Sequence, residues 1–210
     1  MIRVLLADDH RLVREGLRQI LQETPDIVVV DESSNGSDIL PKIRRQPVDV
    51  VILDISMPGR SGLEVLKEIH LNRPGVPVLV LSMHPEEQYA IRVLKAGAAG
   101  YLTKESASEE LISAIRRVAA GGKYIRPTLA EKLADAVGQS SVSTAHEQLS
   151  DRQFEIMRML ATGKTVSEIA AELSLSVKTI STYRSRILAK MNLRNNAEIM
   201  SYALKQGLID

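Results

Sequence analysis

The chain has 210 residues, and its 27 basic side chains nearly balance its 26 acidic ones. This length suits one large domain or two small ones. The absence of cysteine excludes disulfides and thiolate metal sites. No apolar run approaches the ~20 residues that a membrane span requires. Since Met1-Ile2-Arg3 leads directly into a strand-like segment without a signal peptide, we expect a cytoplasmic protein with no membrane association.

Residues 1–122 alternate between strand-like and helix-like segments. The expected strands are the apolar runs at 2–7, 27–30, 48–53, 77–81 and 99–103. Near-continuous Val, Ile and Leu are typical of parallel strands that are covered on both faces. Five strand–helix units of this size predict right-handed crossovers and a doubly wound α/β sheet of five parallel strands.

Stripes of apolar residues mark the helices between these strands. The first expected stripe consists of Leu12, Leu17, Ile20 and Leu21. The last helix of this part is expected to open with a capping box, in which Ser106 and Glu109 satisfy each other's free backbone N–H groups.

Residues 123–147 have the composition of a linker. Pro127 could begin a short helix containing Leu129, Leu133 and Val137. Residues 138–144 have no apolar surface to bury, which predicts a flexible and solvated stretch.

Residues 148–210 show helical signals only. The expected capping boxes are Ser150/Gln153, Thr165/Glu168 and Asn195/Glu198. A tight turn, Ser174-Leu175-Ser176, precedes a helix that runs from Val177 to about Met191, with Ser176 as its cap. Four helices in about 60 residues, with a short turn between the second and the third, predict a small all-α helix-turn-helix domain.

Polar side chains follow four of the expected strands directly. Asp8 and Asp9 follow the first strand, Asp54 the third, Ser82 the fourth and Lys104 the fifth. The carboxyl ends of parallel strands form one crevice, so these side chains should converge there. Any one of them alone could be a capping or surface residue. Together, three carboxylates repel one another unless a cation joins them.

This set of residues predicts a magnesium-dependent phosphoacceptor pocket. Mg²⁺ takes hard oxygen ligands, and we expect Asp9, Asp54 and the backbone carbonyl of Ser56 to bind it directly, with Asp8 acting through water. A carboxylate can act as a nucleophile and carry a phosphoryl group, a role that we give to Asp54. The metal and Lys104 would neutralise the phosphoryl oxygens, and Ser82 could donate its hydroxyl to one of them.

The helix that begins at Val177 has two different faces. Val177, Ile180, Ile187, Leu188 and Met191 are expected to be buried, while Lys178, Ser181, Thr182, Ser185 and Arg186 form the other face. There is no acidic residue between Glu172 and Glu198, although five cationic residues lie there. An ordinary solvated helix face would usually include acids. Short hydroxyls that reach base edges and cations that meet phosphates instead favour a DNA-binding helix.

The first part resembles the receiver domain of two-component response regulators over residues 2–122, which implies a flavodoxin-like fold. The motifs are Ala7-Asp8-Asp9-His10, Leu53-Asp54-Ile55-Ser56-Met57-Pro58 with Gly62, Leu81-Ser82 and Tyr101-Leu102-Thr103-Lys104. The resemblance implies that Asp54 accepts phosphate from a sensor histidine kinase, and that Ser82 and Tyr101 form a switch pair. Ser stands at position 82 where many members have Thr, which keeps the hydroxyl.

The second part is similar to the LuxR-type helix-turn-helix of the NarL/FixJ group over about 148–210. The motifs are Leu149-Ser150-Asp151-Arg152-Gln153-Phe154-Glu155-Ile156, Gly163-Lys164-Thr165, Glu168-Ile169-Ala170 and Leu175-Ser176-Val177-Lys178-Thr179-Ile180-Ser181-Thr182-Tyr183. The resemblance implies double-stranded DNA as a partner, with Ser181, Thr182 and Ser185 facing bases. Backbone contacts or helix support are implied for Lys178, Thr179, Tyr183, Arg184, Arg186 and Lys190. A transcription regulator that forms a homodimer when phosphorylated is expected.

Two other functions must be weighed. Haloacid-dehalogenase-type phosphatases also use a strand-end Asp, but they need a second Asp two positions later as acid and base. Ser56 stands there in this chain, so we expect no turnover enzyme. The other alternative is an orphan regulator whose receiver is never phosphorylated and serves only as a dimerisation or interaction module.

Overall fold

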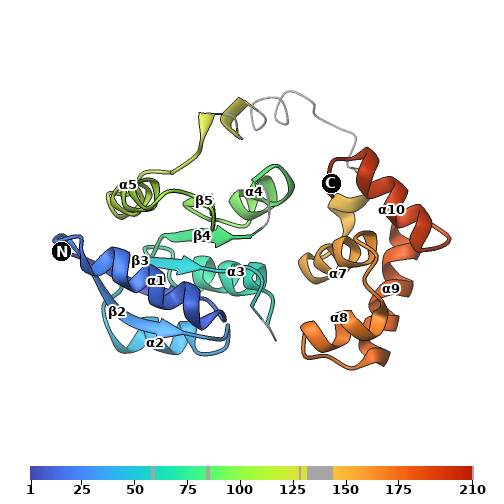
Figure 1. Ribbon diagram of the computed structural model, residues 1–210, viewed down its shortest axis with the longest axis horizontal. Coiled ribbons are helices and arrows are strands. Elements are labelled where there is room, and N and C mark those ends of the chain that lie inside the picture. The colour runs from blue at the N-terminus through green and yellow to red at the C-terminus, as the bar shows by residue number, and fades with distance from the viewer. Residues whose placement is uncertain (58–59, 84–85, 128, 132–143, 210) are drawn as a thin grey trace. The chain divides into compact units, whose positions relative to one another are not determined.

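The computed structural model describes residues 1–57, 60–83, 86–127, 129–131 and 144–209. The chain forms two compact units, Met1–Glu131 and Lys132–Asp210, and each is described by itself. The first unit alternates strands and helices, and the described part of the second contains helices only (Figure 1). Both fold classes were predicted from the sequence.

The first unit is built on a five-stranded parallel sheet. Its strands are β1 (Ile2–Ala7), β2 (Ile27–Ser33), β3 (Val50–Leu53), β4 (Val78–Ser82) and β5 (Gly100–Thr103). Their order across the sheet is β2-β1-β3-β4-β5. β2 is therefore added on one side of β1 and the later strands on the other, which puts the topological switch point between β1 and β3. The helices are α1 (Arg11–Gln22), α2 (Ile39–Arg45), α3 (Gly62–Asn72), α4 (Glu86–Lys95) and α5 (Ser108–Ala119).

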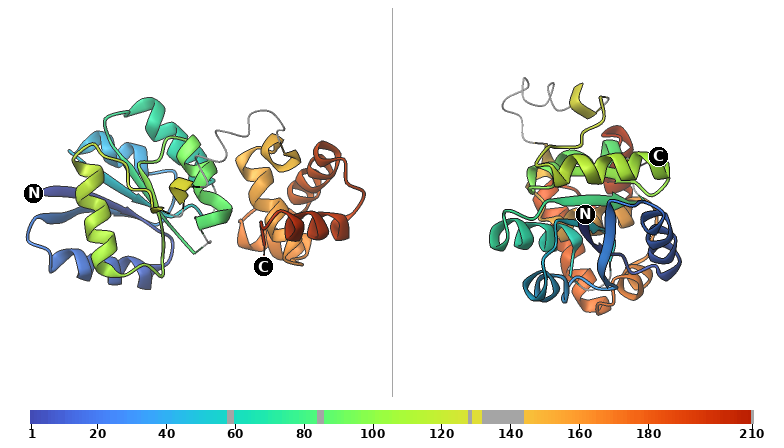
Figure 2. Two further views of the ribbon diagram at one scale, coloured as in Figure 1. Left: turned by 90° about the horizontal axis from the view of Figure 1, so that it is seen from above. Right: turned by 90° about the vertical axis from the view of Figure 1, so that its left-hand side faces the viewer.

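Helices cover both faces of this sheet (Figure 2). On one face, α1 and α5 pack through Leu17, Leu21 and Ile115 against strand residues such as Leu6 and Ile52. Adjacent strand residues such as Leu5 and Val51 are also fully buried, although successive side chains point to opposite faces. Burial on both faces explains why the strands are unbroken apolar runs.

The two edges of the sheet are each covered by other parts of the first unit. At β2, the Lys42 ammonium donates to the Glu32 carbonyl, and the Gln46 amide donates to the Val30 carbonyl at 3.3 Å. At β5, the segment after α5 forms a parallel bridge between Tyr124 and Gly100. These contacts occupy backbone groups that an edge strand would otherwise expose.

One ion pair ties the start of β1 to the residue before β3. The Arg3 guanidinium donates to both carboxylate oxygens of Asp49, at 2.9 and 2.6 Å, and the Arg3 backbone N–H donates to Asp49 at 2.8 Å. The hydrogen bond from the Arg3 side chain lowers the pKa of Asp49 from 3.8 to about 2, although burial opposes this.

Asp49→Asn is expected to destabilise the protein by about 1 kcal/mol at pH 7, because these partly exposed groups are screened by solvent. A lowered folded pKa gives stability that is present above the unfolded pKa of 3.8 and is lost as pH falls through about 2. The difference between wild type and variant should therefore shrink between pH 4 and pH 2. Urea unfolding across this pH range measures the difference in the free energy of unfolding. A difference that stays constant would contradict the assignment of this stability to the Arg3–Asp49 ion pair.

The second unit contains a short 3₁₀ helix and four α-helices in its described part. They are η1 (Ala145–Gln148), α7 (Asp151–Ala161), α8 (Val166–Glu172), α9 (Val177–Met191) and α10 (Asn196–Lys205). The capping boxes at Ser150 and Thr165 are confirmed. At Asn195 only half of the box forms, because the Glu198 carboxylate accepts from the Arg194 N–H instead. None of the helices in the described ranges is long and apolar enough to cross a bilayer.

Three other local predictions were wrong. Leu12 is 82% exposed, because a step of five residues turns it roughly 140° around the helix from Leu17. Val177 is 51% exposed, since it is the first residue of α9 and precedes the buried seam that begins at Ile180. Ser106 does not cap α5, whose N-cap residue is Ala107 without a side-chain bond, because the Ser106 hydroxyl accepts from Arg126.

The predicted linker lies only partly within the described residues. Pro127 and 129–131 are helical, which agrees with a helix that begins at Pro127. The expected helix positions Leu133 and Val137, and residues 138–143 of the predicted flexible stretch 138–144, lie outside the described residues. Its last residue, Thr144, is the N-cap of the 3₁₀ helix η1.

Candidate functional site

Two buried carboxylates lie side by side at the carboxyl ends of β1 and β3. The ladder pairs Ala7 with Leu53, so the residues that follow, Asp8 and Asp54, are neighbours. Backbone bonds fix both, because the Asp54 N–H donates to the Ala7 carbonyl at 2.8 Å and the Asp8 N–H to the Ser33 carbonyl at 3.0 Å. Asp8 is 2% exposed and Asp54 is 1% exposed. Such burial is costly for a charged group unless a partner compensates it.

Lys104 supplies that partner. Its Nζ atom lies 2.6 Å from Asp8 Oδ2 and 2.7 Å from Asp54 Oδ2, so one ammonium joins both carboxylates. The backbone places it there, since the Lys104 N–H donates to the Ser82 carbonyl at 2.8 Å across the β4–β5 pair. The structure therefore brings Asp8, Asp54 and Lys104 together, as the sequence predicted.

The environment shifts the pKa values of both charged groups. Burial raises the pKa of Asp54, and the Lys104 charge only partly offsets this effect. Burial alone would lower the pKa of Lys104, but the carboxylates of Asp54 and Asp8 outweigh burial and raise it. The raised pKa of Lys104 favours its protonated form, and the Lys104 charge opposes the effect of burial on Asp54, which favours the ionised carboxylate that a nucleophile requires.

Asp9 and His10 complete a group that could hold a metal ion. One ligand atom each from Asp8, Asp9, His10 and Asp54 lies within 4.8 Å of the other three. His10 Nδ1 is 3.1 Å from Asp9 Oδ1, and the His10 N–H donates to Asp8 Oδ1 at 2.8 Å. The carboxylate oxygens of Asp8, Asp9 and Asp54 suit a hard cation such as Mg²⁺, so these three residues fit the predicted ion. Sequence reasoning gave His10 no role, although its place directly after two acids was a signal.

The loop after β3 contributes through its backbone. The Ser56 N–H donates to Asp54 Oδ1 at 2.9 Å, while Asp54 Oδ2 accepts from Lys104. Each carboxylate oxygen of Asp54 therefore has a donor, which fixes the plane of the group. The Gly62 position cannot carry a side chain, because a Cβ there would lie 2.4 Å from the Ile55 Cα atom. The predicted role of the Ser56 carbonyl as a metal ligand stays a prediction.

Ser82 and Tyr101 lie on the two strands beside this pocket. Ser82 ends β4 and is fully buried, and its register partner is Thr103, next to Lys104. Tyr101 is 1% exposed and pairs with Val80 two residues earlier in β4. Both residues are therefore on the strands that position Lys104. Their action as a switch pair stays a prediction.

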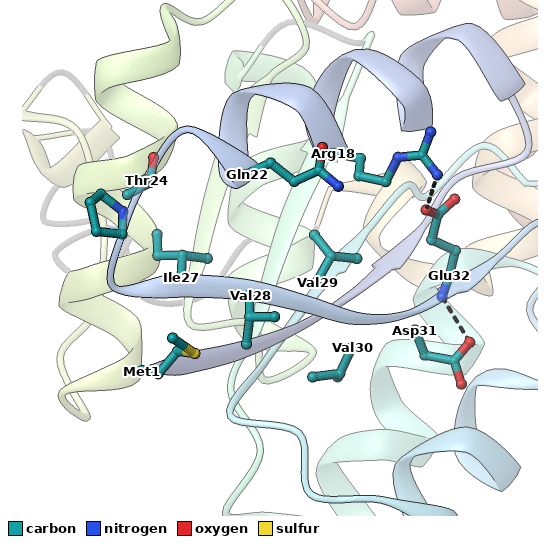
Figure 3. A pocket seen from close by; sticks show the side chains of 11 residues that line it. Met1, Arg18, Gln22, Thr24, Ile27, Val28, Val29, Val30, Asp31 and Glu32 are labelled. Atoms are coloured by element: carbon teal, nitrogen blue, oxygen red, sulfur yellow. Dashed lines mark hydrogen bonds and ion pairs between the residues drawn. The ribbon is translucent and has the colours of Figure 1, made fainter.

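A separate hollow of about 640 Å³ lies beside edge strand β2. Figure 3 shows its lining along β2, with Val29 on the side of α1, Val28 and Val30 on the other side of the strand, and the Arg18–Glu32 ion pair at one end. None of the predicted site residues lines it. The candidate site is thus the cluster of charged groups at the strand ends, and not this hollow.

In the second unit, α8 and α9 form the predicted helix-turn-helix. Ser174 adopts a left-handed φ of 54°, and the Leu175 N–H donates to the Ala170 carbonyl at 2.9 Å, so the chain reverses tightly after α8. The Ser176 hydroxyl then accepts from the Thr179 N–H at 3.0 Å and caps α9. Ile180, Ile187 and Met191 are buried, which fixes the face that α9 presents outward.

That outward face carries most of the residues predicted to contact DNA. The exposed side chains are Lys178, Ser181, Thr182, Ser185 and Arg186, whereas Thr179 is half-buried. A hollow of about 320 Å³ is lined by Ser176, Lys178, Thr179, Thr182, Tyr183 and Arg186. It is bordered by a lysine and an arginine, a setting that suits a phosphate group.

Lys190 has a different environment from the other predicted contacts. Its Nζ atom donates to Gln153 Oε1 at 2.9 Å and to the Gln148 carbonyl at 3.3 Å. These bonds tie the end of α9 to the start of α7 and to the last residue of η1. Sequence reasoning had assigned Lys190 to the DNA backbone, and that role stays a prediction.

Two family descriptions match the chain, one for each unit. Residues 4–116 match the response regulator receiver domain, and residues 147–203 match the luxR family of bacterial regulatory proteins. The chain therefore belongs to the response regulators of two-component systems, with a receiver domain and a LuxR-type DNA-binding domain. It is a transcription regulator of the NarL/FixJ type.

Known proteins resemble it over nearly its whole length. The response regulator UvrY of Escherichia coli K12 is 41% identical over 99% of this chain and 96% of its own. The response regulator GacA of Pseudomonas aeruginosa is 37% identical over 100% of this chain and 99% of its own. Among solved structures, the RcsB–DNA complex has a TM-score of 0.60 at 27% identity and covers 98% of both chains. The response regulator ChrA of a heme-sensing two-component system has a TM-score of 0.54 at 36% identity, over 99% of this chain and 98% of its own.

Proposed function

We propose that a sensor histidine kinase transfers a phosphoryl group to Asp54, and that this transfer controls DNA binding by α9. The observation that carries the proposal is the buried pair Asp8 and Asp54, joined by one ammonium at 2.6 and 2.7 Å. A purely structural buried pair would need one acid and one base, whereas here the acids exceed the base. The excess negative charge suits a divalent cation and a group-transfer site.

The chemistry is nucleophilic substitution at phosphorus. An oxygen of the Asp54 carboxylate attacks the phosphorus, the bond from phosphorus to the donor's imidazole nitrogen breaks, and the nitrogen keeps the electron pair. Lys104 holds one oxygen of Asp54 before transfer and can then bind a phosphoryl oxygen. Mg²⁺, held by Asp9, Asp54 and the Ser56 carbonyl with Asp8 through water, would neutralise charge on the transferred group.

Phosphate accumulation on the intact protein tests this chemistry. Incubation with acetyl phosphate and Mg²⁺ should add one phosphoryl group per chain, as intact mass spectrometry detects, and chelation of Mg²⁺ should prevent it. Release of more than one equivalent of phosphate, at a rate that exceeds phosphoprotein decay, would instead indicate a phosphatase. Failure to form any phosphoprotein would favour the orphan regulator.

The hydroxyls of α9 favour a particular kind of base contact. Thr182 Oγ1 donates to the Lys178 carbonyl at 2.9 Å, and Ser185 Oγ donates to the Ser181 carbonyl at 3.1 Å. Each hydroxyl proton is therefore used within the helix, while the oxygen lone pairs remain as acceptors. Such an oxygen suits the amino groups of adenine or cytosine, which are donors in the major groove.

Ser185→Ala is expected to change the base preference at one base pair of the binding site. The free energy of binding to the preferred base should become less favourable by about 1 kcal/mol or more. Arg186→Ala should instead weaken binding to all DNA sequences alike and reduce the salt dependence of binding, because it removes a phosphate contact. Selection from a random-sequence DNA pool, followed by titration at several salt concentrations, measures both effects. A sequence-selective loss in Arg186→Ala would contradict this division of roles.

Phosphorylation is proposed to release the DNA-binding unit and to promote a homodimer. A two-fold dimer would place its half-sites about one helical turn apart, ~34–36 Å. Sizing with and without beryllofluoride and Mg²⁺ tests dimerisation. A cytoplasmic location follows from this proposal, since the kinase's phosphodonor group and the DNA meet the protein there.

A further inference from the structure

The chain that leaves α5 remains part of the receiver sheet. The Tyr124 N–H donates to the Ala99 carbonyl at 2.8 Å, and the Lys123 ammonium donates to the Ala98 carbonyl at 2.6 Å. A Cβ at Gly100 would lie 2.7 Å from the Tyr124 carbonyl oxygen, so only glycine permits this close approach. The start of the chain toward the DNA-binding unit is thus fixed along β5.

A carboxylate on α5 binds two residues of this segment. Glu110 Oε1 accepts from the Tyr124 hydroxyl at 2.9 Å and from Arg126 Nε at 2.7 Å, and Oε2 accepts from the same guanidinium at 2.5 Å. The hydrogen bonds from Arg126 are the main reason that the pKa of Glu110 is lowered. Bidentate pairs of this kind are both strong and geometrically specific.

The same guanidinium reaches the loop that carries Lys104. Arg126 donates to Ser106 Oγ at 2.8 Å, and Ser106 Oγ is 3.3 Å from Thr103 Oγ1. The Ser106 N–H donates to the Thr103 carbonyl at 3.0 Å, which closes a turn with Lys104 at its second position. Any change in the placement of Lys104 therefore acts on a turn that Arg126 touches.

We propose that Ser106, Glu110, Tyr124 and Arg126, which we name the Glu110 clamp, report the state of Asp54 to the segment leading out of the receiver. This inference rests on the proposed phosphorylation of Asp54. In the described structure Lys104 binds Asp8 and Asp54. A phosphoryl group on Asp54 draws the ammonium away from these carboxylates, and the turn from Thr103 to Ser106 shifts with it. The hydrogen bond from Arg126 to Ser106 then breaks, the other bonds of the clamp weaken, and residues 123–127 separate from β5.

Hydrogen exchange of the full-length protein tests the clamp directly. In wild type, the amide of Tyr124 should exchange about 5-fold faster or more when beryllofluoride and Mg²⁺ occupy the site. In Arg126→Ala and in Glu110→Gln, exchange should be fast without beryllofluoride. Glu110→Gln keeps the shape of the side chain, so it still tests the clamp if Arg126→Ala does not fold. Arg116→Ala is the matched control. Like Arg126, Arg116 pairs with a carboxylate, but it lies on α5 with Glu110 and binds Asp26 at 2.7 Å, outside the clamp.

DNA binding provides the second readout, with a duplex selected from a random-sequence pool by the phosphorylated wild type. The two clamp variants should bind it about 5-fold more tightly or better before phosphorylation, and their gain on phosphorylation should shrink by the same factor. Arg116→Ala should behave as wild type. If beryllofluoride raises DNA binding in wild type while the exchange of Tyr124 stays unchanged, the clamp is overturned and the proposed function stands. If wild type neither takes up beryllofluoride nor gains affinity, the proposed function itself fails.

Discussion

Asp54→Asn is expected to abolish phosphoryl uptake and, with it, all phosphate-dependent DNA binding. The amide keeps the shape of the side chain but is not a nucleophile, so no aspartyl-phosphate can form. A phosphoryl group adds about −1.5 to −2 charges at this buried position. Coupling of this kind typically changes affinity by about 5- to 150-fold, and the variant should lose that whole factor.

Intact mass and DNA titration in the same samples measure this prediction. The variant should show no mass increase with acetyl phosphate and Mg²⁺, while its affinity without phosphodonor stays at the wild-type value. If acetyl phosphate raised DNA binding equally in wild type and Asp54→Asn, control would operate at another residue, and the proposed mechanism would be wrong.

Lys104→Met is expected to remove phosphorylation and also to destabilise the protein by about 3–5 kcal/mol at pH 7. The reason is that Asp8 and Asp54 would keep their buried negative charges without the ammonium that joins them. Burial already raises the pKa of Asp54 in the wild type. A raised carboxyl pKa means that ionised Asp54 costs stability above the unfolded pKa of 3.8, and that this cost disappears as pH falls and the group becomes protonated.

The deficit of Lys104→Met should therefore be largest at neutral pH and become smaller on acidification. Urea unfolding at several pH values measures it. The double variant Lys104→Met/Asp54→Asn should recover part of the lost stability, because one of the two buried charges is gone. If the double variant were as unstable as the sum of both single changes, the loss would come from packing and not from charge.

The sequence predicted the strands and the convergence of acids well, because both depend on short-range signals. A strand that is buried on both faces, such as Val50–Leu53, needs an unbroken apolar run, and its end marks where Asp54 must lie. The caps at Ser150 and Thr165 were equally clear, since each box spans four residues. In these cases the partners that stabilise the structure are neighbours along the chain.

The remaining features depend on partners that are distant in the sequence. Residues 123–126 have linker-like composition, and their place beside the sheet comes from Glu110 and from the two carbonyls that precede β5. Lys190 donates to Gln153 Oε1, a bond that the sequence did not predict, while its role at the DNA backbone stays a prediction. No local pattern specifies these contacts.

Each border of the parallel sheet is partly covered, at β2 by the side chains of Lys42 and Gln46 and at β5 by the bridge from Tyr124 to Gly100. An open border of this type invites strands from other copies and leads to fibrous aggregates. Covering part of each border therefore disfavours edge-to-edge pairing between copies of the protein. If the Glu110 clamp opens on phosphorylation, the β5 border becomes accessible only in the signalling state, so self-association through it would be limited to the lifetime of the phosphoprotein.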